Sequence, residues 1–218
     1  PCFSRNLWAM GSSGWWNVGR LRGVPIRIHW SAVLGALFFS GFRFAPGGWL
    51  GFVLVILVHE LGHAAVVKIA RQHVHGVTIH GMGGECQWSG NATPIQRACI
   101  AWGGVWGQLA LFAVTLPLVG LMRATMGTMG AELAYALTWG SLVLAALNLI
   151  PFGPLDGVEA WKLPGLLVQR YKRRRGRAKT EAARSAKPAG SKQEVSPEIR
   201  ALMEKIAKDA RDARRGTN

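Results

Sequence analysis

Residues 48–70, which read GWLGFVLVILVHELGHAAVVKIA, decide how this chain folds. The run is apolar throughout, apart from His59, Glu60 and His63 near its middle and Lys68 near its end. A helix needs roughly 20 apolar residues to cross the hydrocarbon core of a bilayer. Ionisable side chains at that depth are rare and mostly functional. The run therefore predicts a membrane-spanning helix that carries a functional site.

The spacing of the three central side chains indicates different tasks for them. In a helix, His59 and His63 are four residues apart and project from the same face, so both imidazoles can bind one metal ion. Glu60 lies about 100 degrees further round the helix. From there its carboxylate can reach a water molecule at the metal instead of the metal itself. We interpret the histidines as metal ligands and Glu60 as a general base.

Further apolar runs place this helix in a membrane. Residues 98–122 and 133–155 contain no charged side chain, and each run is long enough to span a bilayer. Residues 28–42 form a shorter uncharged run between Arg27 and Arg43, whose long side chains can reach the two interfaces. The sequence thus predicts an all-α integral membrane protein with about four transmembrane helices.

The segment between the second and third expected helices is polar and rich in glycine. Residues 77–82 and 85–89 flank Gly83 and Gly84 in the pattern of a short β-hairpin. We therefore expect a glycine-containing hairpin loop in this otherwise helical protein.

Two histidines do not complete a catalytic zinc site, which usually has three protein ligands and one open position. Asp156 is the best candidate for the third ligand, because apart from Glu132 and Glu159 it is the only acidic residue near a membrane helix outside the histidine motif and its hairpin. It lies at the end of the last expected span, within the stretch NLIPFGPLDG, residues 148–157. The prolines and glycines there break the helix and let the chain turn Asp156 inward. From the residues alone, an ordinary helix-terminal role for Asp156 remains an alternative.

With these two motifs the chain resembles the site-2 protease family of intramembrane zinc metalloproteases. The family signatures are H-E-x-x-H in one membrane helix and N-x-x-P-x-x-x-x-D-G in a later one, and both are complete here. Residues 23–30 also resemble the start of the first helix in bacterial members related to sporulation-factor proteases. The resemblance covers roughly residues 20–160.

The resemblance implies one zinc ion per chain and hydrolysis of a peptide bond in or near a transmembrane segment of a membrane protein, as in regulated intramembrane proteolysis. An extended substrate segment would pair with the hairpin. The residues that it implies are His59, His63 and Asp156 as zinc ligands, Glu60 as the catalytic base, and Asn148, Gly83 and Gly84 as supporting or substrate-binding residues.

One stretch departs from the family pattern. Residues 102–108, WGGVWGQ, stand where the third helix of many members has a Gly-Pro and Asn motif. The departure motivates an alternative function, in which the protein is catalytically silent and binds membrane segments as a scaffold.

The net charge of +15 is uneven, and most of the excess lies after residue 161. Basic segments beside membrane spans tend to stay in the cytoplasm. We therefore expect a bacterial inner-membrane protein with cytoplasmic N- and C-termini. The basic run at residues 172–175 is expected to contact anionic lipid. A membrane-tethered cationic protein that binds nucleic acid is the alternative, although we expect no nucleic-acid partner.

These features divide the chain into four parts. The parts are an interfacial N-terminal segment (1–27), a membrane-embedded metalloprotease core (28–160), a basic flexible linker (161–195) and a short amphipathic helix (196–218). Ser196 is the expected cap of that helix, and its apolar face is expected to hold Ile199, Leu202, Met203 and Ile206. No residue pattern assigns an oligomeric state.

Overall fold

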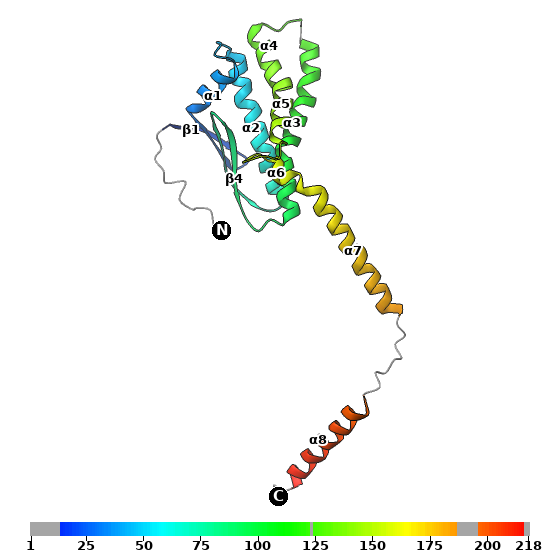
Figure 1. The fold of residues 1–218 in the computed structure, drawn as a ribbon. Coiled ribbons are helices and arrows are strands. Elements are labelled where there is room, and N and C mark those ends of the chain that lie inside the picture. Colours follow the sequence, from blue (N-terminus) through cyan, green and yellow to red (C-terminus); the bar gives the residue numbers. More distant parts are fainter. Residues whose placement is uncertain (1–13, 123, 187–195, 216–218) are drawn as a thin grey trace. The chain divides into compact units, whose positions relative to one another are not determined.

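The computed structural model describes residues 14–122, 124–186 and 196–215. The chain divides into two compact units, Pro1–Gln169 and Arg170–Asn218. Within the first unit, α2 (Pro46–Ile69) lies between a small sheet and the helices α3 (Pro94–Met122), α4 (Thr128–Tyr135) and α5 (Ser141–Asn148), as Figure 1 shows.

The sheet has four strands in the order β1-β2-β3-β4. The strands are β1 (Trp15–Leu21), β2 (Val24–His29), β3 (His73–His80) and β4 (Gly83–Ser89). Two antiparallel pairs, β1–β2 and β3–β4, are joined by a parallel pairing of β2 with β3. The chain passes from β2 to β3 through α1 (Ser31–Phe39) and α2. β4 therefore lies at one edge of the sheet.

Buried aliphatic side chains fix the sheet against one side of α2. Val77 and Ile79 of β3 are fully buried. Val77 packs in a cluster with Ala64 of α2, and Ile79 packs in a second cluster with Ile56 of the same helix. The sheet thus covers one side of α2 along the stretch that contains the histidine motif.

Glycines bring α3 against another side of α2. A Cβ atom built on Gly62 would lie 2.3 Å from the Gly103 carbonyl oxygen, and one built on Gly103 would lie 2.7 Å from that of Gly62. A Cβ on Gly107 would lie 2.8 Å from the carbonyl oxygen of Val58. Small residues at this spacing let membrane helices approach closely. Part of the unusual 102–108 stretch therefore serves helix packing.

The last long apolar helix contains a π-helical turn, η2 (Ala136–Gly140), between α4 and α5. The Thr138 hydroxyl donates to the Ala134 carbonyl at 2.6 Å, and the Ser141 hydroxyl donates to that of Leu137 at 2.8 Å.

In α4, a Glu132 carboxylate oxygen accepts a hydrogen bond from the Gly47 backbone N–H at 3.1 Å. This carboxylate satisfies a free N–H at the start of α2.

Three helices within the described residues are long and apolar enough to cross a membrane. They are Pro46–Ile69, Pro94–Met122 and Thr128–Asn148. Large apolar side chains are exposed along the second of them, including Val114, Leu116 and Leu118. Exposed apolar surface of this kind suits contact with lipid.

The described chain is mostly helical with long apolar helices, as expected, but it is not all-α, because it also builds a four-stranded sheet. The hairpin was predicted, and it is present as β3 and β4, although its turn lies at Gly81 and Met82, so that Gly83 and Gly84 begin β4. The strands β1 and β2 lie where an interfacial segment and the start of a helix were expected. The alternation of Val24, Ile26 and Ile28 with more polar residues is the period-two pattern of a strand, with Val24 and Ile26 buried.

The expected first span, residues 28–42, is also different in the structure. Strand β2 includes Ile28, and the helix α1 has 9 residues before it ends at Ser40. Gly41 and Phe42 follow with φ angles of 66° and 60°, which end the helix. Nine residues rise only about 14 Å, less than the roughly 30 Å of the hydrocarbon core. The cytoplasmic placement of both termini assumed four spans and stays a prediction.

After α5 come the short helix α6 (Gly157–Ala160) and the longer helices α7 (Lys162–Ala186) and α8 (Pro197–Arg215). α7 occupies much of the expected flexible linker, since Arg, Lys and Ala are good helix formers even without a buried face. α8 lies where an amphipathic helix was expected, and the Ser196 hydroxyl accepts a hydrogen bond from the Ile199 N–H at 3.4 Å. Residues 1–13, 187–195 and 216–218 of the expected segments lie outside the described residues.

Gly103→Ala is predicted to destabilise the protein, because the new methyl group would press on the Gly62 carbonyl across the α2–α3 contact. Overpacking of this kind typically lowers the free energy of unfolding by about 1–3 kcal/mol. Thermal unfolding in detergent measures the effect. Gly120→Ala on the same helix is the control, since a Cβ there would meet nothing within 4 Å. Equal melting temperatures for the two variants would contradict the close packing.

Candidate metal centre

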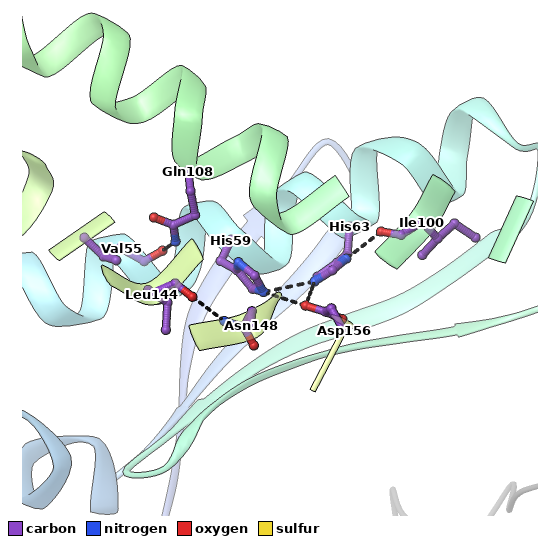
Figure 2. Close-up of polar contacts among 8 residues, drawn as sticks. All are labelled: Val55, His59, His63, Ile100, Gln108, Leu144, Asn148 and Asp156. Carbon is purple, nitrogen blue, oxygen red and sulfur yellow. Dashed lines mark hydrogen bonds and ion pairs between the residues drawn. The ribbon is translucent and has the colours of Figure 1, made fainter. Parts of the chain in front are cut away.

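Three side chains from two distant parts of the sequence lie close together at α2 (Figure 2). His59 and His63 are buried on α2, and Asp156 lies directly before α6. Asp156 Oδ2 is 3.0 Å from His59 Nε2 and 3.1 Å from His63 Nε2. The two Nε2 atoms are 3.1 Å apart. Within the described part of the chain, this trio forms the cluster of potential metal ligands.

The separations between these three atoms suit a small metal ion. Zinc binds histidine nitrogen at about 2.0–2.1 Å and carboxylate oxygen at about 2.0–2.2 Å, so ligand atoms of a tetrahedral site lie about 3.3 Å apart. The three observed distances are slightly shorter than this value. Two imidazoles and one carboxylate are also a donor set that catalytic zinc sites use. The trio therefore fits zinc in both chemistry and spacing.

The hydrogen bond of His63 decides which of its nitrogens faces the other two ligands. His63 Nδ1 lies 2.7 Å from the Ile100 carbonyl oxygen on α3 (Figure 2). Because a carbonyl can only accept, Nδ1 carries the proton and the neutral ring has a lone pair on Nε2. That lone pair points toward a carboxylate oxygen and a second imidazole nitrogen. A shared proton or a metal cation between the three atoms can therefore hold them together.

The charge on Asp156 agrees with a ligand role. Burial disfavours the ionised carboxylate, but the hydrogen bonds and charges of His59 and His63 outweigh burial and lower the pKa of Asp156 to about 2. The carboxylate is thus ionised at neutral pH. Metal binding requires deprotonated ligands, so a cation bound here would take the place of a proton shared with the imidazoles.

A break after α5 brings Asp156 to the histidines. α5 ends at Leu149, and Gly153 has a φ angle of 57°, which turns the chain back. A Cβ atom built on Gly157 would lie 2.5 Å from the carbonyl oxygens of both Leu149 and Ile150. Only glycine allows the backbone to close the turn so tightly. The break expected from the prolines and glycines is therefore a compact turn with Asp156 near its end.

Gly104 on α3 makes room for both imidazoles. A Cβ atom built there would lie 2.4 Å from His59 Cε1 and 2.6 Å from the Nε2 atoms of His59 and His63. Any larger residue would push the two ring nitrogens aside. Sequence reasoning missed this residue, although the pair Gly103-Gly104 in an apolar helix was visible as a sign of close backbone approach.

Glu60 lies outside the metal-ligand trio and beneath β4. The side chain is buried, and a Cβ atom built on Gly84 would lie 2.7 Å from Glu60 Oε1. The backbone of Cys86, two residues further along β4, also contacts the Glu60 carboxylate. The hairpin glycines therefore differ in what they do: Gly84 allows close approach to Glu60, whereas Gly83 adopts a φ angle of 141° at the turn.

Cys86 lies on β4, close enough to Glu60 for the charge of this carboxylate to act on its thiol. Burial, and then the charges of Glu60 and Glu85, raise the pKa of the Cys86 thiol to about 12. The thiol stays protonated, and a protonated thiol is a poor nucleophile and metal ligand. Cys86 therefore acts as a packing residue.

Asn148 and Gln108 are amides beside the site (Figure 2). The Asn148 side chain donates a hydrogen bond to the Leu144 carbonyl of its own helix at 3.1 Å. The fully buried Gln108 donates to the Val55 carbonyl at 2.9 Å, one helical turn before His59. Gln108 thus braces α2 above the site, a role that the sequence pattern did not suggest. A substrate contact for Asn148 stays a prediction.

Comparisons with known proteins add relatives to this geometry. No protein-family model matches the chain. The chain is 32% identical over 197 residues to "Putative zinc metalloprotease Rip3" of Mycobacterium tuberculosis, covering 79% of this chain and 47% of that protein. It is 32% identical over 163 residues to "Putative zinc metalloprotease sll0528" of Synechocystis, covering 66% and 42%. The chain thus spans less than half the length of these relatives.

A solved structure shares the fold. The Site-2 Protease from Methanocaldococcus jannaschii matches with a TM-score of 0.53 at 22% sequence identity, over 72% of this chain and 73% of that chain. Two relatives named as zinc metalloproteases and this shared fold agree with the metal-ligand trio found in the structure.

Gly104→Ala is predicted to weaken metal binding, because the methyl group would displace both histidine nitrogens. Groups that orient ligands typically change metal affinity roughly 10- to 100-fold. Zinc per chain, measured by elemental analysis after dialysis against a chelator, tests this. Gly120→Ala should retain zinc like the unmodified protein. Full zinc retention in Gly104→Ala would show that the rings do not depend on this contact.

Proposed function

This chain belongs to the site-2 protease family of membrane metalloproteases, and we propose that it hydrolyses a peptide bond in or near a transmembrane segment of another membrane protein. One observation carries the proposal. His59, His63 and Asp156 converge, with Glu60 beside them, on a helix that is long and apolar enough to cross a membrane. Such groups are retained at that depth mainly for function.

We assign His59, His63 and Asp156 as the ligands of one zinc ion per chain. When bound, zinc would act as a Lewis acid on the scissile carbonyl and make a water molecule easier to deprotonate. The protein supplies the orientation. The Ile100 carbonyl fixes the His63 ring at 2.7 Å, and Gly104 leaves space for both imidazoles.

Glu60 is the proposed general base. Its position on α2 next to His59 sets the carboxylate beside the metal-ligand trio without joining it. Glu60 would accept a proton from the attacking water and pass it to the leaving amine. Two successive proton transfers through one carboxylate need no covalent acyl intermediate. Glu60 is buried against β4.

The edge strand β4 suggests how a substrate is presented. An edge strand has unpaired backbone N–H and C=O groups that can pair with a further strand. A transmembrane substrate hides its amides inside helical hydrogen bonds, so it must unwind locally before cleavage. Strand addition to β4 would hold the unwound segment over Glu60. We therefore propose a substrate-facing role for Gly83 and Gly84.

An apolar cavity supports a membrane segment as the substrate. The cavity has a volume of about 900 Å³ and lies between α1, α2 and the α4–α5 helix. Its lining extends from Arg43 and Glu132 to Val55, Ile56 and Leu147. The last three residues are within about one helical turn of His59 or Asn148 along their helices. An apolar segment lying there would approach the metal-ligand trio.

A catalytically silent scaffold is the alternative that the 102–108 stretch raised. In the structure this stretch supplies Gly103 and Gly107 to the α2–α3 contact and Gly104 to the histidines. The residues that depart from the family pattern therefore pack α3 against α2, and the ligand trio next to them is complete. This observation favours the protease over the scaffold.

We further propose that the protein lies in a bacterial inner membrane with its basic tail in the cytoplasm. The basic run at residues 172–175 is exposed on α7, where it can contact anionic headgroups. The membrane-protein substrate and the lipid bilayer are the partners of this proposal. A nucleic-acid partner is not part of it.

Glu60→Gln is predicted to abolish cleavage while keeping zinc, whereas Asp156→Ala is predicted to lose both. Loss of a general base typically lowers the rate by a factor of about 10²–10⁴, and loss of one ligand opens the metal site. Co-expression with tagged candidate membrane proteins measures cleavage, and elemental analysis of the purified variants measures zinc. Cleavage that persists in both variants would exclude this mechanism.

Removing residues 171–218 is predicted to leave cleavage intact, because the metal-ligand trio and Glu60 all lie in the first unit. The same co-expression assay applies, with Glu60→Gln in the full chain as the inactive reference. A cationic binding protein would behave in the opposite way, losing function with its tail and keeping it with Glu60→Gln.

A further inference from the structure

The turn that carries Asp156 is tied at both ends by tryptophan indoles. Trp161, directly after α6, donates from Nε1 to the carbonyl oxygen of Leu149 at 2.7 Å. Leu149 is the residue at which α5 ends. This hydrogen bond closes the turn, because it joins the residue directly after α5 to the residue directly after α6.

A second indole joins this turn to α3. Trp102 donates from Nε1 to the carbonyl oxygen of Ala160 at 3.0 Å. Ala160 is the last residue of α6, and its N–H donates to the Asp156 carbonyl at 2.8 Å. The rings of Trp102 and Trp161 also pack edge to face, with centroids 5.9 Å apart. The backbone around Asp156 is therefore connected to α3 through one helical turn and one indole.

The part of α3 that holds Trp102 also positions the histidines. Ile100 accepts the hydrogen bond from His63, and Gly104 lies against both imidazoles. Trp102 lies between them in the sequence. Two metal ligands of α2 and the third ligand from the turn are thus placed relative to each other by one short segment, residues 100–104.

We propose that Trp102 and Trp161 are positioning residues that hold Asp156 at the metal site. Their indole N–H groups fix the turn against α3, so that the carboxylate reaches the two histidine nitrogens. Within the described residues neither indole hydrogen-bonds to His59, His63 or Asp156, and both act through the backbone of the turn. This inference rests on the proposed metal site.

Trp106 offers a matched control on the same helix. Its ring lies 6.2 Å from that of Trp102, and its side chain is 61% exposed. Within the described residues its indole N–H makes no hydrogen bond. Replacing Trp106 by phenylalanine therefore removes an indole from α3 without releasing the turn.

The test uses the 218-residue chain in detergent and the variants Trp102→Phe, Trp161→Phe and Trp106→Phe. Phenylalanine keeps an aromatic ring and removes the N–H. Zinc affinity is measured by competition with a chelator, and the visible spectrum of the cobalt-loaded protein reports ligand geometry. Loss of either hydrogen bond is expected to weaken zinc binding roughly 10- to 100-fold and to alter the cobalt spectrum. Trp106→Phe should match the unmodified chain in both.

Thermal unfolding of the metal-free variants separates positioning from packing. The proposal expects melting temperatures close to that of Trp106→Phe, because each turn variant retains its ring. Unchanged zinc affinity and cobalt spectra in Trp102→Phe and Trp161→Phe would overturn it. A loss of affinity matched by an equal loss of metal-free stability would overturn it as well, by assigning the indoles to general packing. An unmodified chain that binds no zinc would instead reject the proposed metal site.

Discussion

The structure depends on placing two imidazoles and a carboxylate side by side within a helix that is otherwise apolar. An ionisable side chain at mid-membrane depth costs about 2.5–3.5 kcal/mol on insertion scales. His59, Glu60 and His63 are nevertheless buried together on α2. Each face of the helix must therefore be covered by protein that offers a partner. The sheet, α3 and the turn at Asp156 provide this cover.

Several of those partners are backbone groups, and glycine residues let the backbone come close enough to provide them. Gly62 and Gly103 bring α3 close enough for the Ile100 carbonyl to accept a hydrogen bond from His63 Nδ1. Gly84 lets β4 lie directly over Glu60, and Gly157 closes the turn at Asp156. Backbone groups are held by their own secondary structure, so they orient the site without the entropy of ordering long side chains.

The candidate ligand set could be predicted from the sequence because it depends on local spacing. His59 and His63 share a helix face by periodicity alone, and the proline and glycine break marks where Asp156 can turn inward. The sheet was only partly foreseen, since β2 pairs with β3 across two intervening helices. The short run at residues 28–42 has the composition of a span, but apolar composition cannot separate strand, short helix and membrane helix. Gly104 and Trp102 matter through contacts that no spacing rule contains.

Two different layers cover α2 because adjacent side chains on a helix point in different directions. His59 and Glu60 are adjacent, so their side chains diverge by about 100 degrees. The metal-ligand face meets α3 and the turn at Asp156, whereas the Glu60 face meets β4. A peptide paired with the edge of β4 would reach the metal-ligand trio from the side on which Glu60 lies. Glu60, the proposed base, would then lie between the substrate held on β4 and the metal-ligand trio. Under the proposed function the sheet would thus be part of the catalytic arrangement, because β4 would determine the side from which a peptide reaches Glu60.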